Sequence, residues 1–275
     1  MTEPLDAVAA IHNAFRRDME GIDAAAFDSA RGKPGLAPIV ERFRFFNEVL
    51  VWHAKGEELG IFPALEAAVP SVAEAYERDH RALDVAFDAL SAAVSAHDAL
   101  ETARATAAFK SHLDLHLDEE DAHLYRLVSE RVPVPDQGKA VGIMSSTVPQ
   151  ERFVEVVAWI FPLMGHNDRE NMTRIWQLVL PPPVFNRAKQ LIQEAIGDDW
   201  AELTRRIPTG SCPQPSLLGP WLGIPQWVVL KRRLPSVRWW WILISAFGWG
   251  IQFPGMIPGL MLTRLLRQLG VPSCQ

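Results

Sequence analysis

Apolar side chains recur every three or four positions through the first 206 residues, as they do on one face of an α-helix. The strict alternation of apolar and polar residues that marks strands is missing from this part of the chain. Proline and glycine interrupt the pattern and divide it into segments. The pattern predicts four long helices, at residues 5–29, 37–68, 72–95 and 98–131. It also predicts four shorter ones, at residues 137–147, 149–164, 168–180 and 184–206.

Long helices joined by short connections are typical of an up-down bundle. We therefore predict an all-α fold, with a four-helix bundle at residues 1–135 and a helical extension at 136–208 that packs on it. Within the second long helix, Gly60 and Pro63 predict a kink or a restart.

Composition changes after about residue 208. Six of the ten tryptophans lie between Trp221 and Trp249, and the last acidic residue is Glu202. Residues 239–263 carry no charge over a length that meets the ~20 residues of a membrane span. We interpret 209–275 as a separate apolar tail. It could span a membrane, lie on one through its flanking basic residues, or dock on the bundle or on another subunit of a homo-oligomer.

The formal net charge of −6 argues against a broad nucleic-acid surface. The chain has two cysteines, Cys212 and Cys274, which excludes a disulfide framework, a cysteine-based zinc site or an iron–sulfur cluster in the helical part. The first residues contain acidic side chains and no apolar core of a secretory signal, so we expect a cytoplasmic location, with membrane contact only through the tail.

Two of the predicted helices carry the same His-x-x-x-Glu pattern. His53 precedes Glu57 in HAKGE, and His116 precedes Glu120 in HLDEE. Residues four apart lie on one face of a helix, so an imidazole nitrogen and a carboxylate oxygen can reach a common ion. The other two long helices each bring a histidine, listed here with the pairs as candidate metal ligands: His12, His53, Glu57, His80, His116 and Glu120.

Ligands on different helices meet only if they lie at the same depth in the bundle. His12 and His53 are 21 and 20 residues from Lys33 in the first turn, and His80 and His116 are 17 and 19 residues from His97 in the third. These differences correspond to only ~1.5–3 Å along a helix axis. The middle turn fits less well, and the interruption at Gly60 and Pro63 could absorb that mismatch.

Six such donors suit two iron ions better than one zinc ion, which usually takes four ligands. Two irons with two bridging glutamates and one oxo or hydroxo bridge would keep a position open for O2, NO or peroxide. A ferritin-like di-iron site needs Glu-x-x-His instead, so that alternative is disfavoured by the spacing. The alternatives that stay open are a metal-free interaction module and another metal.

The order of single histidine, HxxxE, single histidine, HxxxE resembles the hemerythrin HHE cation-binding domain. The stretches HAKGEELGIFPAL and HLDEEDAHLYRL are similar to the second- and fourth-helix motifs of that family. The resemblance extends over about residues 5–206 and implies that the four histidines bind iron and that both glutamates bridge. One departure is Tyr76, which stands four residues before His80 where the oxygen carriers have another histidine. Tyr76 is a candidate weak ligand, and His112 is a candidate fifth histidine or a residue beside the ligands.

From these residues we expect a non-haem di-iron protein that binds O2, NO or peroxide for sensing, storage or detoxification. An enzyme that consumes peroxide at the same centre is the alternative. No nucleophile triad, phosphate loop or dinucleotide motif is present in the sequence.

Overall fold

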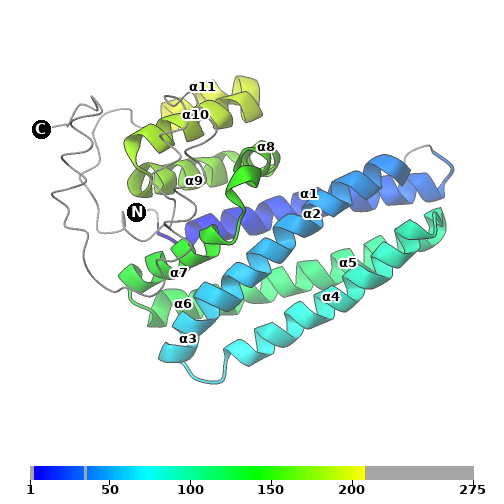
Figure 1. Ribbon diagram of the computed structural model, residues 1–275, viewed down its shortest axis with the longest axis horizontal. Helices are drawn as coiled ribbons and strands as arrows, with labels where there is room; N and C mark the ends of the chain where they lie inside the picture. Colours follow the sequence, from blue (N-terminus) through cyan, green and yellow to red (C-terminus); the bar gives the residue numbers. More distant parts are fainter. Residues whose placement is uncertain (1–2, 34–35, 208–275) are drawn as a thin grey trace, which may run out of the picture. The chain divides into compact units, whose positions relative to one another are not determined.

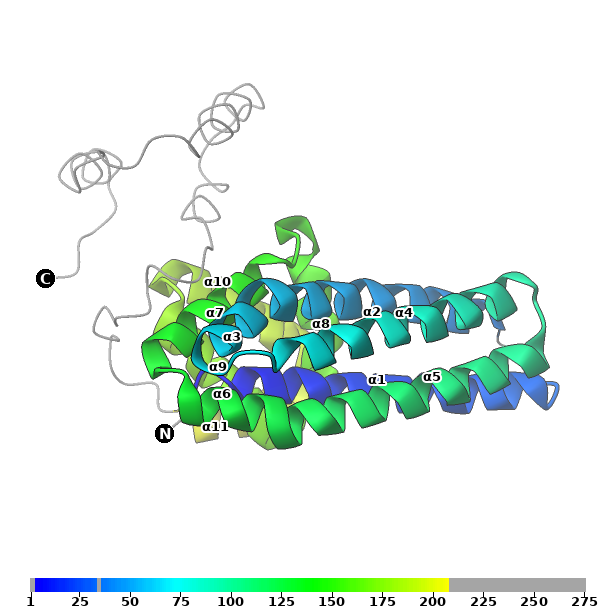
Figure 2. The ribbon, with the colours of Figure 1, turned by 90° about the horizontal axis from the view of Figure 1, so that it is seen from below.

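The computed structural model describes residues 3–33 and 36–207, and this part of the chain is all α-helical, without strands. Four long helical segments run side by side as a bundle (Figures 1 and 2). They are α1 (Asp6–Ala30), α2 (Leu36–Gly56) with η1 (Glu57–Ile61) and α3 (Phe62–Ala68), α4 (Ala73–Ser95), and α5 (Ala99–Glu119) with η2 (Glu120–Leu124) and α6 (Tyr125–Arg131). The predicted all-α bundle is confirmed.

The bounds of the long helices agree with the sequence pattern within a few residues. Asp98 caps α5, because its Oδ1 accepts hydrogen bonds from the backbone N–H groups of Leu100 and Glu101, both at 3.0 Å. The interruption predicted at Gly60 and Pro63 takes the form of the π-helix η1, after which α3 starts at Phe62. Pro63 lies in the first turn of α3, a position where proline is tolerated.

The extension contains α7 (Val134–Ser146), η3 (Gln150–Arg152), α8 (Phe153–Leu163), α9 (His166–Val179), α10 (Pro182–Ile196), η4 (Gly197–Asp199) and α11 (Trp200–Arg206). In both views, α7–α11 lie against the half of the bundle where α1 begins, and α1 and α4 end at the uncovered end (Figures 1 and 2). Glycine allows α7 to approach closely: a Cβ on Gly60 would lie 2.5 Å from the carbonyl oxygen of Ala140.

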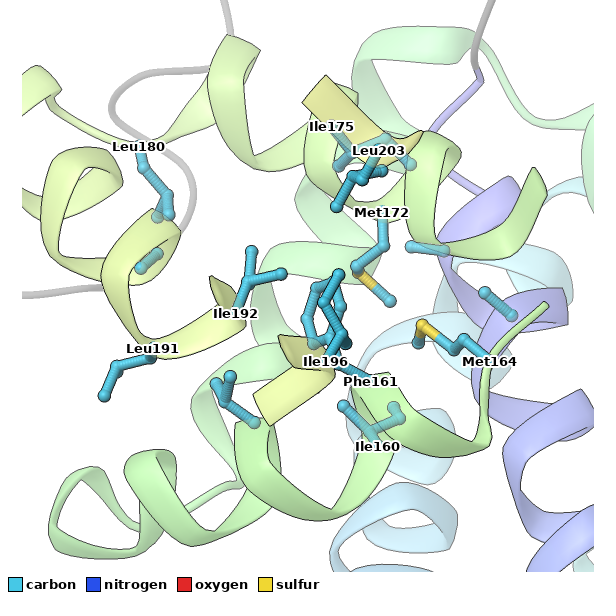
Figure 3. Close-up of a cluster of buried hydrophobic side chains, with 14 of the residues drawn as sticks. Ile160, Phe161, Met164, Met172, Ile175, Leu180, Leu191, Ile192, Ile196 and Leu203 are labelled. Carbon is cyan, nitrogen blue, oxygen red and sulfur yellow. The ribbon is translucent and has the colours of Figure 1, made fainter. Parts of the chain in front are cut away.

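Figure 3 shows the apolar cluster that joins α8–α11 to each other and to α1. Phe161 is fully buried in it, and Ile192 from α10 packs into the same cluster. A second link is polar. Asp18 of α1 is buried, accepts a 2.7 Å hydrogen bond from Nε1 of Trp159 on α8, and accepts another from Nε of Arg42 on α2 at 2.6 Å. The extension therefore packs on the bundle through both apolar and hydrogen-bonded contacts.

Inside the bundle, two further apolar clusters leave a polar level between them. On α1, Val8 belongs to one cluster and Phe15 to the other. On α5 and its continuation, Leu113 and Leu124 belong to different clusters in the same way. Along each of the four long helical segments, the apolar residues before the histidine or His–Glu pair belong mainly to one cluster, and those after it belong mainly to the other.

None of the helices among residues 3–33 and 36–207 is long and apolar enough to cross a membrane. The predicted tail at 209–275, including the uncharged stretch 239–263, lies outside the described residues. Its interpretation and the division of the chain at residues 135 and 208 stay predictions.

Candidate metal centre

The structure brings the six candidate ligands together in the middle of the bundle, with one histidine or one His–Glu pair from each of the four long helical segments. All six side chains are buried, and His12, Glu57 and Glu120 are 0% exposed. Six buried polar side chains at one level would be costly in an apolar core unless they had partners. Their ligating atoms fall into two donor groups that share both glutamates.

The first donor group contains His12, His53, Glu57 and Glu120. The Nε2 atoms of His12 and His53 lie 3.0 Å apart, and Nε2 of His53 lies 3.3 Å from Oε1 of Glu57. Nε2 of His12 lies 3.9 Å from Oε1 of Glu57 and 3.7 Å from Oε2 of Glu120.

The second donor group contains Glu57, His80, His116 and Glu120. Nε2 of His80 lies 3.3 Å from Oε2 of Glu57 and 3.7 Å from Oε1 of Glu120. Nε2 of His116 lies 3.4 Å from the same Oε1 of Glu120. Each glutamate therefore turns one carboxylate oxygen to the first donor group and the other oxygen to the second.

These spacings fit a pair of cations. Ligand bonds of about 2.1 Å place neighbouring donors on one ion about 3 Å apart and opposite donors about 4.2 Å apart. The measured separations of 3.0–3.9 Å fall in that interval. Among the described residues, Oε2 of Glu57, both carboxylate oxygens of Glu120 and Nε2 of His80 are buried without a hydrogen-bond partner. Unpartnered buried donors of this kind are what a bound cation would satisfy.

Both glutamates stand at the start of a π-helical turn. Glu57 begins η1, and Glu120 begins η2. Such turns occur mostly as single bulges within α-helices and are frequent at functional sites. Each π-helical turn starts at the glutamate of an HxxxE motif, so the two helical segments that carry the His–Glu pairs have the same local backbone geometry.

The residue after each motif glutamate contacts the histidine of another helical segment. Oδ1 of Asp121 lies 2.8 Å from Nδ1 of His12, and Oε1 of Glu58 lies 3.0 Å from Nδ1 of His80. These contacts favour the tautomer with the proton on Nδ1, which leaves Nε2 free to face the donor groups. Asp121 is in turn bound by Arg16 at 2.8 Å. Neither Glu58 nor Asp121 was among the predicted site residues, although each directly follows a motif glutamate.

Charge in the centre is unevenly distributed. Burial and the nearby charge of Glu57 raise the pKa of Glu120 to about 8. Burial opposes ionisation of Glu57 as well, but the charge of His53 and the close approach of the His53 and His80 nitrogens outweigh it and hold the pKa of Glu57 well below its usual range. Burial also acts to lower the pKa of His80, yet the facing carboxylates of Glu120 and Glu57 raise it to about 11. Burial lowers the pKa of His116 to about 3.

Tyr125 is a further contact that the sequence pattern did not reveal. Its hydroxyl donates a hydrogen bond to Oε1 of Glu57, and its ring lies 5.5 Å from that of His12. Burial and the charge of Glu57 raise the pKa of this phenol well above its usual value. Tyr125 thus holds a proton against one of the shared carboxylates.

The two additional candidates lie outside the donor groups. His112, the candidate fifth histidine, is exposed and belongs to neither donor group. The buried positions of α5 run through Phe109, Leu113 and His116, and His112 falls at the edge of that stripe. Tyr76 is half-buried and packs with the cluster around Phe62, at a ring separation of 6.2 Å.

Comparison with known proteins agrees with the geometry. The chain is 24% identical over 192 residues to "Zinc finger protein BRUTUS" of Arabidopsis thaliana, a match that covers 67% of this chain and 15% of that protein. No solved structure matches. The profile of the family described as "Hemerythrin HHE cation binding domain" matches residues 3–128, the part that contains all six candidate ligands. Residues 3–128 of this chain therefore match the hemerythrin HHE cation-binding domain family, as the resemblance of the two HxxxE motifs implied.

Proposed function

We propose that the two donor groups hold two iron ions bridged by Glu57 and Glu120, and that this centre binds O2, NO or peroxide for sensing, storage or detoxification. The observation that carries the proposal is the division of each carboxylate between the groups. One oxygen of each glutamate faces the first histidine pair and the other faces the second. A single ion would leave half of these oxygens without a cation.

The donor chemistry favours iron. Four imidazoles and two carboxylates form a mixed nitrogen and oxygen set, which suits non-haem iron. Zinc usually takes four ligands in a closed tetrahedral site, so the four donors of each group would leave a zinc ion no position for an external ligand. Each group offers four donor atoms, so six-coordinate ions would keep positions for a bridge and for an external ligand. Iron bound here would supply redox chemistry and an affinity for O2, NO or peroxide.

The surrounding residues set the conditions of that chemistry. Apolar clusters enclose the centre above and below along the bundle, with Phe15 and Leu117 on one side and Ile61 and Leu124 on the other. Asp121 and Glu58 hold His12 and His80 in orientation.

The proposal is tested by the metal content of the purified full chain and by its absorption spectrum, first reduced without oxygen and then exposed to air. About two irons per chain and new near-ultraviolet absorption in air are expected. A chain that stays colourless and binds no metal after anaerobic loading with iron would refute the proposal and favour a metal-free interaction module.

A peroxide-consuming enzyme is the second candidate, and Tyr125 is the observation that favours it. The phenol keeps a proton next to Oε1 of Glu57 within the buried centre, where bond cleavage in a peroxide would need a proton donor. Turnover of peroxide that is lost in both His53→Ala and Tyr125→Phe would support the enzyme. Iron binding without turnover would favour the binding protein.

A further inference from the structure

A pocket with a volume of about 310 Å³ opens between α2 and α4 and reaches the centre. The sparse contact between these two helices leaves the space for it. Four of the candidate ligands line its inner end: His53, Glu57, His80 and His116. His12 and Glu120 do not line it. The pocket therefore exposes three members of the second donor group and only two of the first.

The wall of the pocket is apolar. It is formed by side chains of α2, α4 and α5, namely Leu50, Val51, Leu83, Phe87 and Phe109. Phe109 is 1% exposed and Leu83 is 7% exposed, whereas Val51 is 47% exposed, so the wall extends from the interior of the bundle to its surface. Charged side chains are found near the opening, with Lys55 on α2 and Asp84 on α4, both exposed. The lining thus combines apolar side chains with four candidate ligands, and it also includes the polar residues Asn47 and Glu58.

The size of the pocket exceeds what a diatomic ligand needs. A water molecule occupies about 30 Å³ of liquid, and O2 or NO is only slightly larger. A volume of about 310 Å³ is at the lower end of the range for small-molecule pockets, which is about 300–1,000 Å³. A diatomic molecule would leave most of the apolar wall in contact with water or with nothing.

We propose that this pocket binds a small organic ligand with an oxygen-donor head and an apolar body, such as an organic hydroperoxide or a short-chain carboxylate. The head would approach the second donor group beside His80 and His116, and the body would pack on Leu83 and Phe109. This inference rests on the proposed function, because the head needs a bound iron. It specifies the ligand class and the donor group that receives it.

Straight-chain carboxylates from acetate to octanoate are suitable probes, because they combine the same kind of head with a graded apolar body and do not oxidise the protein. Their affinity for the iron-loaded full chain is measured by competition with azide, whose own binding is followed in the visible spectrum. Burial of one methylene group on the wall corresponds to an increase in affinity of up to about fourfold. The affinity should therefore rise with chain length until the pocket is full.

Ala54→Leu is the variant that assigns the effect to this pocket. Ala54 lines the pocket from α2, is half-buried and is not a candidate ligand, so a larger side chain there fills the space without removing a donor. Ala82→Leu makes the same change at an exposed position of α4 that does not line the pocket. We expect Ala54→Leu to flatten the chain-length dependence and to leave iron content and azide affinity close to wild type, and Ala82→Leu to behave as wild type.

Three results would overturn the inference. If iron binds and azide binds but carboxylate affinity does not depend on chain length, the pocket proposal falls and the di-iron proposal stands. If the dependence is present but equal in Ala54→Leu and Ala82→Leu, the ligand binds elsewhere. If the chain binds no iron, the proposed function fails, and the pocket proposal fails with it.

Discussion

Replacing Glu120 with glutamine should stabilise the metal-free protein and destabilise the metal-loaded one. The carboxyl group of Glu120 is buried, and its pKa is raised from 4.5 to about 8. A group whose pKa is higher in the folded state contributes stability at low pH, and this contribution is lost as the pH rises from the unfolded value through the folded one. The relevant window here is between 4.5 and about 8. Glutamine has nearly the same shape and no charge to bury, so the variant avoids this loss.

The size of the effect follows from the same shift. At pH 7 the protein is 2.5 pH units above the reference pKa of 4.5, and each unit corresponds to about 1.4 kcal/mol. The metal-free variant should therefore be more stable than wild type by up to about 3 kcal/mol at pH 7, with the difference shrinking toward zero near pH 4.5. Bound metal reverses the sign of this stability difference. Each ion at one hundred times its Kd stabilises the folded wild type by about 2.7 kcal/mol, so two ions contribute about 5.4 kcal/mol and outweigh the gain of about 3 kcal/mol, because the variant lacks a shared carboxylate to hold them.

The assay is urea unfolding followed by circular dichroism, with chelator and with iron, at pH 5 and pH 7. Glu119→Gln is the matched control, because Glu119 is the exposed neighbour on the same helix and its replacement should change stability by less than about 0.5 kcal/mol. A Glu120→Gln variant that is less stable than wild type in chelator at pH 7 would refute the reasoning. It would mean that the buried charge is already compensated by protein groups.

Three further outcomes follow from the contacts of the centre. Asp121→Asn weakens the hydrogen bond that orients His12 and should lower metal affinity by about 10–100-fold in a competition titration. Unchanged affinity would contradict an orienting role for Asp121. Trp159→Phe removes the hydrogen bond to the buried Asp18 and should cost about 1–3 kcal/mol in urea unfolding, with metal affinity unaltered. At pH 7, Glu120 and His80 both carry protons in the metal-free protein, since their pKa values are about 8 and about 11. Metal binding should therefore release about two protons, measured by calorimetry in buffers of different ionisation enthalpy, and a release near zero would disagree.

The arrangement of the bundle was accessible from the sequence because its main determinants are local. Apolar period and proline positions predicted the first helix at 5–29, and it spans Asp6–Ala30. Equal distances from the turns predicted that His12 and His53 share one depth, and their Nε2 atoms lie 3.0 Å apart. These distances hold because an α-helix rises by a constant amount per residue. The assignment of the six side chains as ligands stays a prediction until metal is measured.

The residues around the ligands were harder to find, because π-helical turns break the helical period on which the prediction relied. In a regular α-helix, a side chain five positions after Glu120 would point about 140° away from it. The π-turn η2 lies between Glu120 and Tyr125 and changes that relation, so both side chains face the centre. Asp121 and Glu58 could have been found, since an acidic residue follows the glutamate in both motifs.

The shared carboxylates allow one ion and two ions to be distinguished by a pair of variants. His12 belongs only to the first donor group, so His12→Ala leaves all four members of the second group in place. Glu57 belongs to both groups, so Glu57→Gln damages both. If two ions bind, His12→Ala should retain about one iron per chain, whereas Glu57→Gln should retain less. If one ion binds among all six side chains, the two variants should lose metal to a similar extent. Iron content measured after identical loading, with the far-ultraviolet spectrum as a check on folding, separates these cases. Equal loss in both variants would rule out two separable donor groups.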